Sequence, residues 1–369
     1  MSGRGASTAT ATAGDLILAI ETSCDETAAA VVQGGKVIRA NVVASQVDLH
    51  RRFGGVVPEI ASRRHLELSI PVVDEALERA GAAPADLAAV AVTAGPGLVG
   101  ALLVGVSLAK SLAFGWGKPL VGVNHLEGHI YANFLTVDED GQVIGDGRPP
   151  EFPFLCLVVS GGHSDLIYIE GHGRRRSLGR TRDDAAGEAF DKVARAIGLG
   201  YPGGPLLDAL AREGGDPLAF DLPRARLEAG SLDFSFSGLK TAVVHVLERA
   251  ALAGEEVDRA DLAASFSQAV ADALVDKTLA AARVTGASRI VLAGGVAANS
   301  TLRRTMLERA EAGGLTVRFP PLKLCTDNAA MIGAAGYFRY AAGSRSGLDL
   351  NADPNLAFGD QAVEECRGS

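Results

Sequence analysis

Apolar positions along the chain gather into short strand-like runs and longer segments of helical period. A short apolar run ends in a polar turn at residues 22–26, and strand-type composition resumes twice after it. The same arrangement returns later around a turn at residues 160–163. The runs are Leu16–Glu21, Thr27–Val32 and Lys36–Val43, then Phe154–Val159 and Asp165–Glu170. Since short apolar or alternating runs between turns are typical of strands, the pattern predicts a strand-turn-strand unit that occurs twice.

Helix-like segments follow these units. Asp183–Leu199 carries its apolar residues at helical spacing, with Asp183 or Asp184 as the expected N-cap and Gly198 near the end. Two further strands each lead through a glycine turn into a helix. These are Ala88–Thr93, before the apolar segment Leu98–Trp116, and Ile290–Ala293, before a helix from about Asn299. Strands that alternate with helices indicate an α/β fold, here in two lobes with a cleft between them.

The polar stretches divide the chain into segments. Residues 1–14 form a Ser/Thr/Ala/Gly tail that we expect to be disordered, followed by an N-terminal lobe at 15–140. Thr136–Pro153 is rich in Asp, Gly and Pro, and we place the connection between the lobes at 141–153. The C-terminal lobe then covers 154–343. Residues 344–369 have weak periodicity and are expected to form a loose tail.

Composition narrows the class of protein. With 369 residues, 47% hydrophobic and 21% charged, the chain is long enough for roughly two globular domains. Its four cysteines include no CxxC pair, which argues against a zinc ribbon or a disulfide framework and favours the reducing cytosol. Leu98–Trp116 is broken by Gly100, Gly105, Ser107 and Lys110, so we expect a buried core helix and no membrane span.

The sharpest local feature is the segment Asn124–His129. His125 and His129 stand four residues apart, so one helix face can bring both imidazoles to a metal ion, although surface histidines also occur at this spacing. A zincin protease has Glu directly after the first His, where this chain has Leu126. Glu127 points roughly 200° around the helix from His125, which disfavours proteolysis.

A site with two histidines usually needs an oxygen ligand. The candidate is Asp327, in Cys325-Thr326-Asp327-Asn328, just before an Ala-rich helix. Taken alone, Asp327 is more typical of a helix N-cap than of a ligand. Spacing does not show whether the fold brings this turn to His125.

Three glycine-rich turns can admit a phosphate or a planar ligand against backbone N–H groups. They are Ser160-Gly161-Gly162, Pro202-Gly203-Gly204-Pro205 and Gly294-Gly295. None fits the P-loop pattern, and each is singly more typical of a simple turn. Together, at the ends of predicted strands, they outline one site.

Positive charge is concentrated locally in a chain whose net charge is −9. The overall charge disfavours broad attachment to nucleic acid, so phosphate contacts are expected only at local basic runs. The runs are Arg174–Arg176 with Arg180 and Arg182, and Arg51-Arg52 with Arg63-Arg64-His65. The alternative is that these runs are ordinary solvated faces.

Eight motifs in order resemble those of the tRNA threonylcarbamoyladenosine transferase family, whose members were once labelled O-sialoglycoprotein endopeptidases. The resemblance covers about Leu16 to Gly343. The motifs are Ile20–Thr27, Asn124–His129, Val159–His163, Asp183–Lys192, Tyr201–Pro205, Phe234–Thr241, Gly294–Asn299 and Cys325–Asn328.

The resemblance implies an actin/hexokinase-like pair of lobes, with the final helices packing back on the N-terminal lobe. It implies transfer of a threonylcarbamoyl group from its adenylate, threonylcarbamoyl-AMP, to N6 of adenosine 37 in tRNAs that read ANN codons. His125, His129 and Asp327 are implied as ligands of one divalent metal, iron by resemblance, with zinc also suited to the donors. The implied substrate contacts are Val158, Val159, Ser160, Gly161, Gly162, Asp191, Gly204, Asp208 and Asn299.

Further roles remain hypotheses at this stage. Asp25 and Glu26 face the predicted cleft and can assist proton transfer, with turn formation as the alternative. The resemblance implies two partner proteins, a smaller metal-less paralogue and a P-loop ATPase. A metalloprotease acting on sialoglycoproteins and an ATP-dependent small-molecule kinase of the same fold class are the rival functions.

Overall fold

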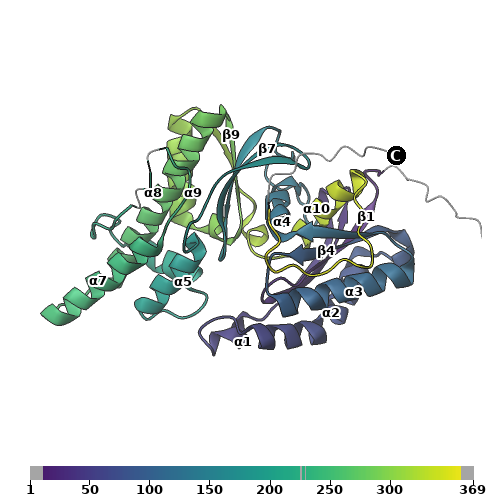
Figure 1. Cartoon of the computed structure of the whole chain (residues 1–369), viewed down its shortest axis with the longest axis horizontal. Helices are drawn as coiled ribbons and strands as arrows, with labels where there is room; N and C mark the ends of the chain where they lie inside the picture. Colours follow the sequence, from purple (N-terminus) through teal and green to yellow (C-terminus); the bar gives the residue numbers. More distant parts are fainter. Residues whose placement is uncertain (1–10, 225–226, 229, 359–369) are drawn as a thin grey trace, which may run out of the picture. The chain divides into compact units, whose positions relative to one another are not determined.

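A computed structural model describes residues 11–358 of the chain apart from 225, 226 and 229 (Figure 1). The chain divides into two compact units. Of the described residues, unit 1 contains 11–46, Pro58–Pro149 and Asn328–Phe358, and unit 2 contains those of Val47–Val57 and Pro150–Asp327. The break between Pro149 and Pro150 falls within the polar stretch where a connection was predicted.

Each unit is built on a five-stranded mixed sheet. In unit 1 the order is β3-β2-β1-β4-β5, and in unit 2 it is β10-β9-β6-β7-β8. Each central strand, β1 or β6, pairs antiparallel with the next strand of the chain and parallel with a later one. The strands are β1 (Leu16–Glu21), β2 (Glu26–Gln33), β3 (Val37–Ser45), β4 (Leu87–Gly95), β5 (Leu120–Asn124), β6 (Phe154–Val159), β7 (Ser164–Gly171), β8 (Arg174–Arg180), β9 (Arg289–Ala293) and β10 (Thr316–Arg318). The predicted duplication of a strand-turn-strand unit in an α/β fold is therefore confirmed.

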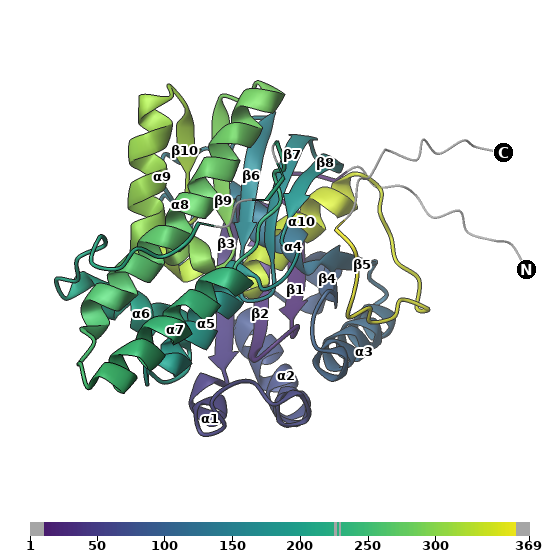
Figure 2. The same cartoon turned by 60° about the vertical axis from the view of Figure 1, so that its left-hand side comes forward.

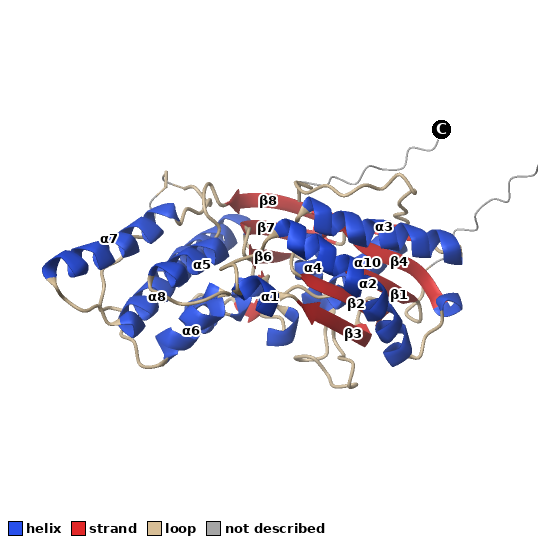
Figure 3. Ribbon diagram, turned by 90° about the horizontal axis from the view of Figure 1, so that it is seen from below, coloured by secondary structure: helices blue, strands red, loops and turns tan. Residues whose placement is uncertain are grey.

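Helices cover these sheets (Figures 2 and 3). Unit 1 holds α2 (Pro58–Ala80), α3 (Val99–Trp116), α4 (His125–Tyr131) and α10 (Ala329–Ala341). Unit 2 holds α1 (Val47–Arg51), α5 (Ala186–Ala196), α6 (Gly203–Arg212), α7 (Ser237–Ala253), α8 (Arg259–Thr285) and α9 (Ser300–Ala312). Four short 3-10 turns complete the described elements, at Pro84–Asp86, Ala132–Phe134, Gly295–Ala298 and Leu322–Leu324.

Both faces of the unit 1 sheet are buried, which explains its continuous apolar strands. Leu18 and Val90 join the cluster formed with α2 and α3. Their neighbours along the strands point to the opposite face. There α10 approaches so closely that a Cβ on Gly333 would lie 2.6 Å from Val32, and one on Gly336 would lie 2.5 Å from Ala91. Glycine on this helix thus seats α10 directly on the sheet.

The helix α3 is less buried than the sequence predicts. Its buried residues follow one helical stripe against the sheet, whereas Phe114 on the outer side is 75% exposed. Only 33% of this helix is buried, although by length and composition it is apolar enough to cross a membrane. Core helices of soluble proteins pass the same test, so this is weak evidence for a span. The predicted core helix is therefore buried along one stripe only, because the sheet covers only one of its faces.

The start of α5 also differs from the prediction. Its N-cap is Ala185, which makes no side-chain capping bond. Asp184 instead pairs with Lys192 at 2.6 Å, and Asp183 accepts hydrogen bonds from Phe236 N at 2.8 Å and Ser237 Oγ at 2.8 Å. Partial burial disfavours the charged carboxylate, but these hydrogen bonds outweigh it and hold the pKa of Asp183 below its ordinary value of 3.8. Asp183 therefore ties two distant motifs together instead of capping its own helix.

The end of the described chain is held in place on unit 1. Ser346 N donates to Leu120 O at 2.8 Å, and Asp353 N donates to Ala94 O at 2.8 Å. Leu356 O accepts from Asn124 Nδ2 at 3.2 Å. The prediction of a loose tail is wrong for residues 344–358, because backbone hydrogen bonds fix this segment without any apolar periodicity. The remainder of the predicted tail, and residues 1–10 of the predicted disordered tail, lie outside the described residues.

A buried carboxylate in unit 2 makes stability depend on pH. Asp165 of β7 lies opposite Arg180, and its Oδ2 is buried with no hydrogen-bond partner among the described residues. Burial raises the pKa of Asp165 from 3.8 to about 6, and Arg180 opposes this only in part. Between these two pH values the folded state holds a proton that the unfolded state has lost. The contribution of this group to stability is therefore fully present below pH 3.8 and is lost as the pH rises through about 6.

We expect Asp165→Asn to remove this loss, because the amide carries no charge to bury. The variant should unfold like the wild type near pH 4 and be more stable at pH 8, by on the order of 2 kcal/mol. Urea unfolding at both pH values measures the difference. Parallel stability curves for the two proteins between pH 4 and pH 8 would contradict it.

Candidate metal centre and substrate turns

The chain turns from β5 directly into α4, and this turn positions the first histidine. Asn124 ends the strand and its Oδ1 accepts a hydrogen bond from Leu126 N at 2.9 Å, which caps the helix. His125 is therefore the first residue of α4, and all seven residues of this short helix are buried. A Cβ on Gly128 would lie 2.6 Å from Ile332 of α10, so the two helices are in close contact.

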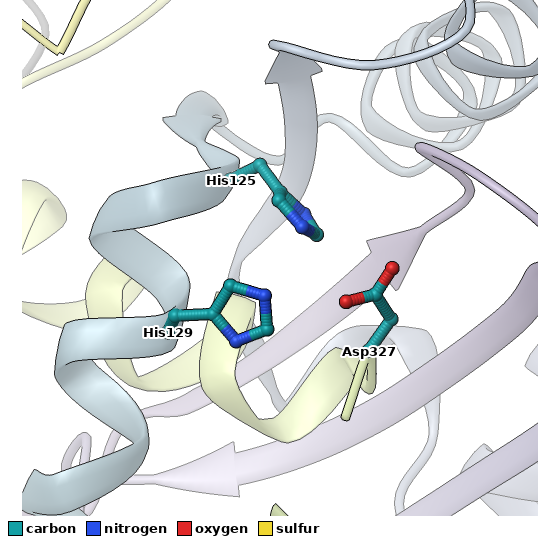
Figure 4. A group of neighbouring side chains, drawn as sticks. All are labelled: His125, His129 and Asp327. Atoms are coloured by element: carbon teal, nitrogen blue, oxygen red, sulfur yellow. The ribbon is translucent and has the colours of Figure 1, made fainter. Parts of the chain in front are cut away.

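The two histidines face the same side of α4, as the sequence predicts. Their ring centroids lie 4.7 Å apart with the planes at 80°. Asp327 joins them from the second position before α10 (Figure 4), and the ligand atoms of the three side chains all lie within 4.8 Å of one another. The N-cap of α10 is Asn328, whose side chain accepts from Met331 N at 3.0 Å. The capping alternative for Asp327 is therefore excluded.

This donor set fits a divalent metal ion. Two imidazole nitrogens and one carboxylate oxygen are ligands that iron and zinc both accept, and such a set leaves coordination positions open for a substrate. Ligands about 2.0–2.2 Å from a tetrahedral ion stand roughly 3.5 Å from one another. Small side-chain rotations bring atoms that lie within 4.8 Å to that spacing.

Glu127 is turned away from the two histidines, as the helical geometry predicts. Its buried Oε2 pairs with Arg339 of α10 at 3.0 Å. A zincin base must reach the metal-bound water from the residue after the first histidine, which is Leu126 here. The structure therefore agrees with the argument against proteolysis.

In unit 2 the turn after β6 packs on the start of α5. Gly187 N donates to Ser160 O at 3.2 Å, and a Cβ on Gly187 would lie 2.5 Å from that oxygen. Gly161 and Gly162 are exposed, and a Cβ on either would meet nothing within 4 Å. The backbone of this turn is thus open to a ligand. The side chains of Val158 and Val159 are fully buried, so only their backbone can take part.

Three other predicted contact residues hold helix N-termini in unit 2. Asp191 Oδ1 accepts from Gly203 N at 2.8 Å, at the start of α6. Asp208 of α6 accepts from Ser300 N at 2.9 Å and Ser300 Oγ at 2.7 Å, at the start of α9. Asn299 caps α9 through Leu302 N at 2.9 Å. The structure therefore links α5, α6 and α9 around these positions, and Gly204 lies among them with open space where a Cβ would be.

The two acids proposed for proton transfer follow β1 in unit 1. Asp25 is 6% exposed, and its backbone oxygen accepts from Gln46 N at 3.0 Å. Glu26 is the first residue of β2, and its Oε1 accepts from Ser45 Oγ at 3.1 Å. These contacts match the turn-forming alternative as well as the catalytic one, and the proton-transfer role stays a prediction.

Comparison with known proteins decides the family. The model of the tRNA N6-adenosine threonylcarbamoyltransferase family matches residues 37–334. The chain belongs to this family. A relative named tRNA N6-adenosine threonylcarbamoyltransferase from Symbiobacterium thermophilum is 62% identical over 93% of this chain and 97% of its own length. Another of that name, from Geobacillus thermodenitrificans, is 59% identical over 92% of this chain and 96% of its own.

Solved structures with much lower identity share the fold. HypF from T. kodakarensis matches with a TM-score of 0.60 and 16% identity, over 90% of this chain and 49% of that chain. Component A of (R)-2-hydroxyglutaryl-CoA dehydratase from Acidaminococcus fermentans matches with a TM-score of 0.51 and 16% identity, over 89% of this chain and all of that one. The two-lobed actin/hexokinase-like α/β fold expected from the sequence is thereby confirmed. The expected cleft between the lobes stays a prediction.

Because the family name includes tRNA, the arginines of the predicted basic runs are of interest as phosphate contacts. Within the described part of the chain, the structure divides them into arginines that pair with a carboxylate and arginines that do not. Several are neutralised: Arg51 pairs with Asp48, Arg64 with Glu67, and Arg182 with both Glu228 and Asp233. His65 is buried. By contrast, Arg174 and Arg176 are exposed on β8, the edge strand of its sheet, and neither has an acidic partner among the described residues. Arg176 lies over the Tyr168 ring at 5.9 Å from its centroid.

Proposed function

We propose that this chain transfers the threonylcarbamoyl group from threonylcarbamoyl-AMP to N6 of adenosine 37 in tRNAs that read ANN codons, releasing AMP. Membership of the tRNA N6-adenosine threonylcarbamoyltransferase family supports this function most directly. The grouping of His125, His129 and Asp327 supports a metal-dependent mechanism. Family membership likewise favours this function over the protease and small-molecule kinase alternatives.

The reaction is an acyl transfer. The N6 amine of the adenosine attacks the carbamoyl carbon, the bond from that carbon to the phosphate oxygen breaks, and the amine loses one proton as AMP leaves. A divalent metal, iron in this proposal and zinc as the alternative, would be held by His125, His129 and Asp327 and would stabilise negative charge on an oxygen of the adenylate. The protein's own residues mainly position the two substrates.

The polar groups of unit 2 suit the adenylate. Backbone N–H groups at Gly161 and Gly162 can donate to its oxygens, because nothing fills the space beside the two glycines. Ser160 shapes this turn, since its own N–H donates to His163 O at 2.9 Å. Asp191 can accept from a ribose hydroxyl or from the threonyl group, and Asn299 can contact the adenosine. In unit 1, Asp25 or Glu26 would accept the proton from N6.

The decisive experiment detects the product nucleoside. The chain is incubated with an ANN-reading tRNA, threonylcarbamoyl-AMP, and the metal-less paralogue and P-loop ATPase that we propose as its cytoplasmic partners. Mass spectrometry of the digested tRNA should show threonylcarbamoyladenosine, and none should form on a tRNA in which adenosine 37 is replaced by guanosine. Absence of the product from the complete reaction would overturn the proposed function.

The exposed arginines of β8 are expected to contact tRNA phosphates. We expect the double variant Arg174→Gln/Arg176→Gln to weaken tRNA binding and to reduce the slope of log affinity against log salt by about 1 to 2, because each phosphate contact releases counterions. The matched control is Arg64→Gln/Arg79→Gln, which removes the same charge from arginines already paired with Glu67 and Glu75. Filter binding across a salt series measures both slopes, and equal slopes for the two variants would place the RNA elsewhere.

A further inference from the structure

A buried carboxylate lies directly behind the first histidine of the metal group. Glu21 is the last residue of β1 and its side chain is fully buried, with 0% exposed. Its Oε2 lies 3.1 Å from His125 Nδ1. No sequence pattern marks Glu21 as part of a metal site, because it stands at the end of an apolar strand and belongs to no ligand-spacing pattern.

Two further hydrogen bonds hold this carboxylate in place. Ser23 N donates to Oε1 at 2.5 Å, and Thr93 Oγ1 donates to Oε2 at 2.5 Å. Thr93 belongs to β4, which pairs with β1, so Glu21 is held from two neighbouring strands of one sheet. A charge buried this deeply is costly unless its oxygens are hydrogen-bonded, and here both of them are.

The contact with His125 selects one tautomer of the imidazole. An ionised carboxylate only accepts hydrogen bonds, so the hydrogen between the two groups is on Nδ1 of His125. The lone pair is then on Nε2, the other ring nitrogen, which becomes the ligand atom. Ser23 Oγ also lies 3.1 Å from Nδ1, and as a hydroxyl it adapts to either tautomer. Glu21 therefore imposes the choice that the hydroxyl leaves open.

We propose that Glu21 is a positioning residue that fixes the tautomer and the ring orientation of His125 for metal binding. This inference rests on the proposed function, since it assumes that His125 binds a metal. Glu21 reaches no metal itself and acts only through the imidazole. Outer carboxylates of this kind raise the basicity of a ligating histidine, and their loss typically costs about 10- to 100-fold in metal affinity.

Glu21→Gln is the sharpest variant because it keeps the size and shape of the side chain. Glutamine has one acceptor oxygen, and Ser23 N requires it, so the NH2 group falls on the side of Thr93 and His125. That group donates to Nδ1 and moves the imidazole hydrogen to Nε2, the tautomer that cannot bind the metal. We expect a fall in Zn²⁺ affinity of about 10- to 100-fold.

The affinity is measured by competition of Zn²⁺ with a chromophoric chelator, on protein whose circular dichroism matches the wild type. Glu127→Gln is the matched control, because it changes another buried carboxylate, one within α4 that pairs with Arg339, and it should bind Zn²⁺ like the wild type. Equal affinities for Glu21→Gln and the wild type would overturn the role of Glu21 alone. Failure of the wild type to bind Zn²⁺ would overturn it together with the metal centre.

A second measurement needs no variant. Nitrogen NMR of the metal-free wild type with labelled histidine reports which ring nitrogen of His125 carries the hydrogen, and we expect Nδ1. A hydrogen on Nε2 would overturn the proposal even if transfer activity is intact.

Discussion

Replacing His125 or Asp327 by alanine is expected to abolish stoichiometric metal binding and to lower threonylcarbamoyl transfer by more than about 100-fold. The effect should exceed the roughly 10- to 100-fold loss that is typical when only a hydrogen-bond partner of a metal ligand is removed. Each substitution leaves two protein ligands, too few to retain an ion that must also keep open positions for a substrate. The fold should survive in Asp327→Ala, because Asn328 caps α10. Elemental analysis of the purified variants and a transfer assay measure the two effects.

His245→Ala is the control for this experiment. His245 is an exposed histidine on α7 whose ring pairs with Glu248, and its loss should leave metal content unchanged. A wild-type metal content in both His125→Ala and Asp327→Ala would remove the basis for the metal centre. Loss of metal with full transfer activity would instead show that the transfer reaction does not need the metal.

Gly187→Ala is expected to lower transfer activity by about 100-fold, the effect of a displacement of about 1 Å at a reacting centre. Its Cβ would lie 2.5 Å from Ser160 O and 2.8 Å from Gly161 Cα. Both atoms belong to the backbone of the turn that we assign to the adenylate, so the turn itself must move. A steady-state transfer assay with saturating tRNA measures the loss.

Gly115→Ala makes the same chemical change where a Cβ meets nothing within 4 Å. Gly115 lies inside α3, so this control should keep full activity and gain up to about 1 kcal/mol of stability from the better helix propensity of alanine. If Gly187→Ala is as active as Gly115→Ala, the turn does not position the reacting groups.

Part of the site follows from sequence because its geometry is local. His125 and His129 are four residues apart in a capped helix, and the helical repeat alone places them on one face. The strand-turn-strand units are equally local, since their apolar runs match the buried strands β1, β2, β6 and β7. β8 was not predicted as a strand, because its arginines hide the apolar pattern, and an edge strand tolerates such charge.

Other features are decided by contacts between segments far apart in the chain. Asp183 has the sequence position of an N-cap, but its hydrogen-bond donors belong to residues 235–237, about fifty positions later in the chain. Arginines with and without a carboxylate partner look alike in sequence, and only the structure shows which ones have a carboxylate beside them. Glu21 has no signal at all in its own strand, because its significance comes from His125, more than a hundred positions later.

The sequence by itself determined the duplicated α/β plan, the paired histidines and, through eight ordered motifs, the family. Only the tertiary structure decided that Asp327 reaches those histidines, that Asn328 and not Asp327 caps α10, and that Glu21 lies behind His125. The physical reason is that periodicity and capping are set by residues within a few positions of one another. A shared ligand site or a buried hydrogen bond depends instead on where the packed strands and helices place distant residues.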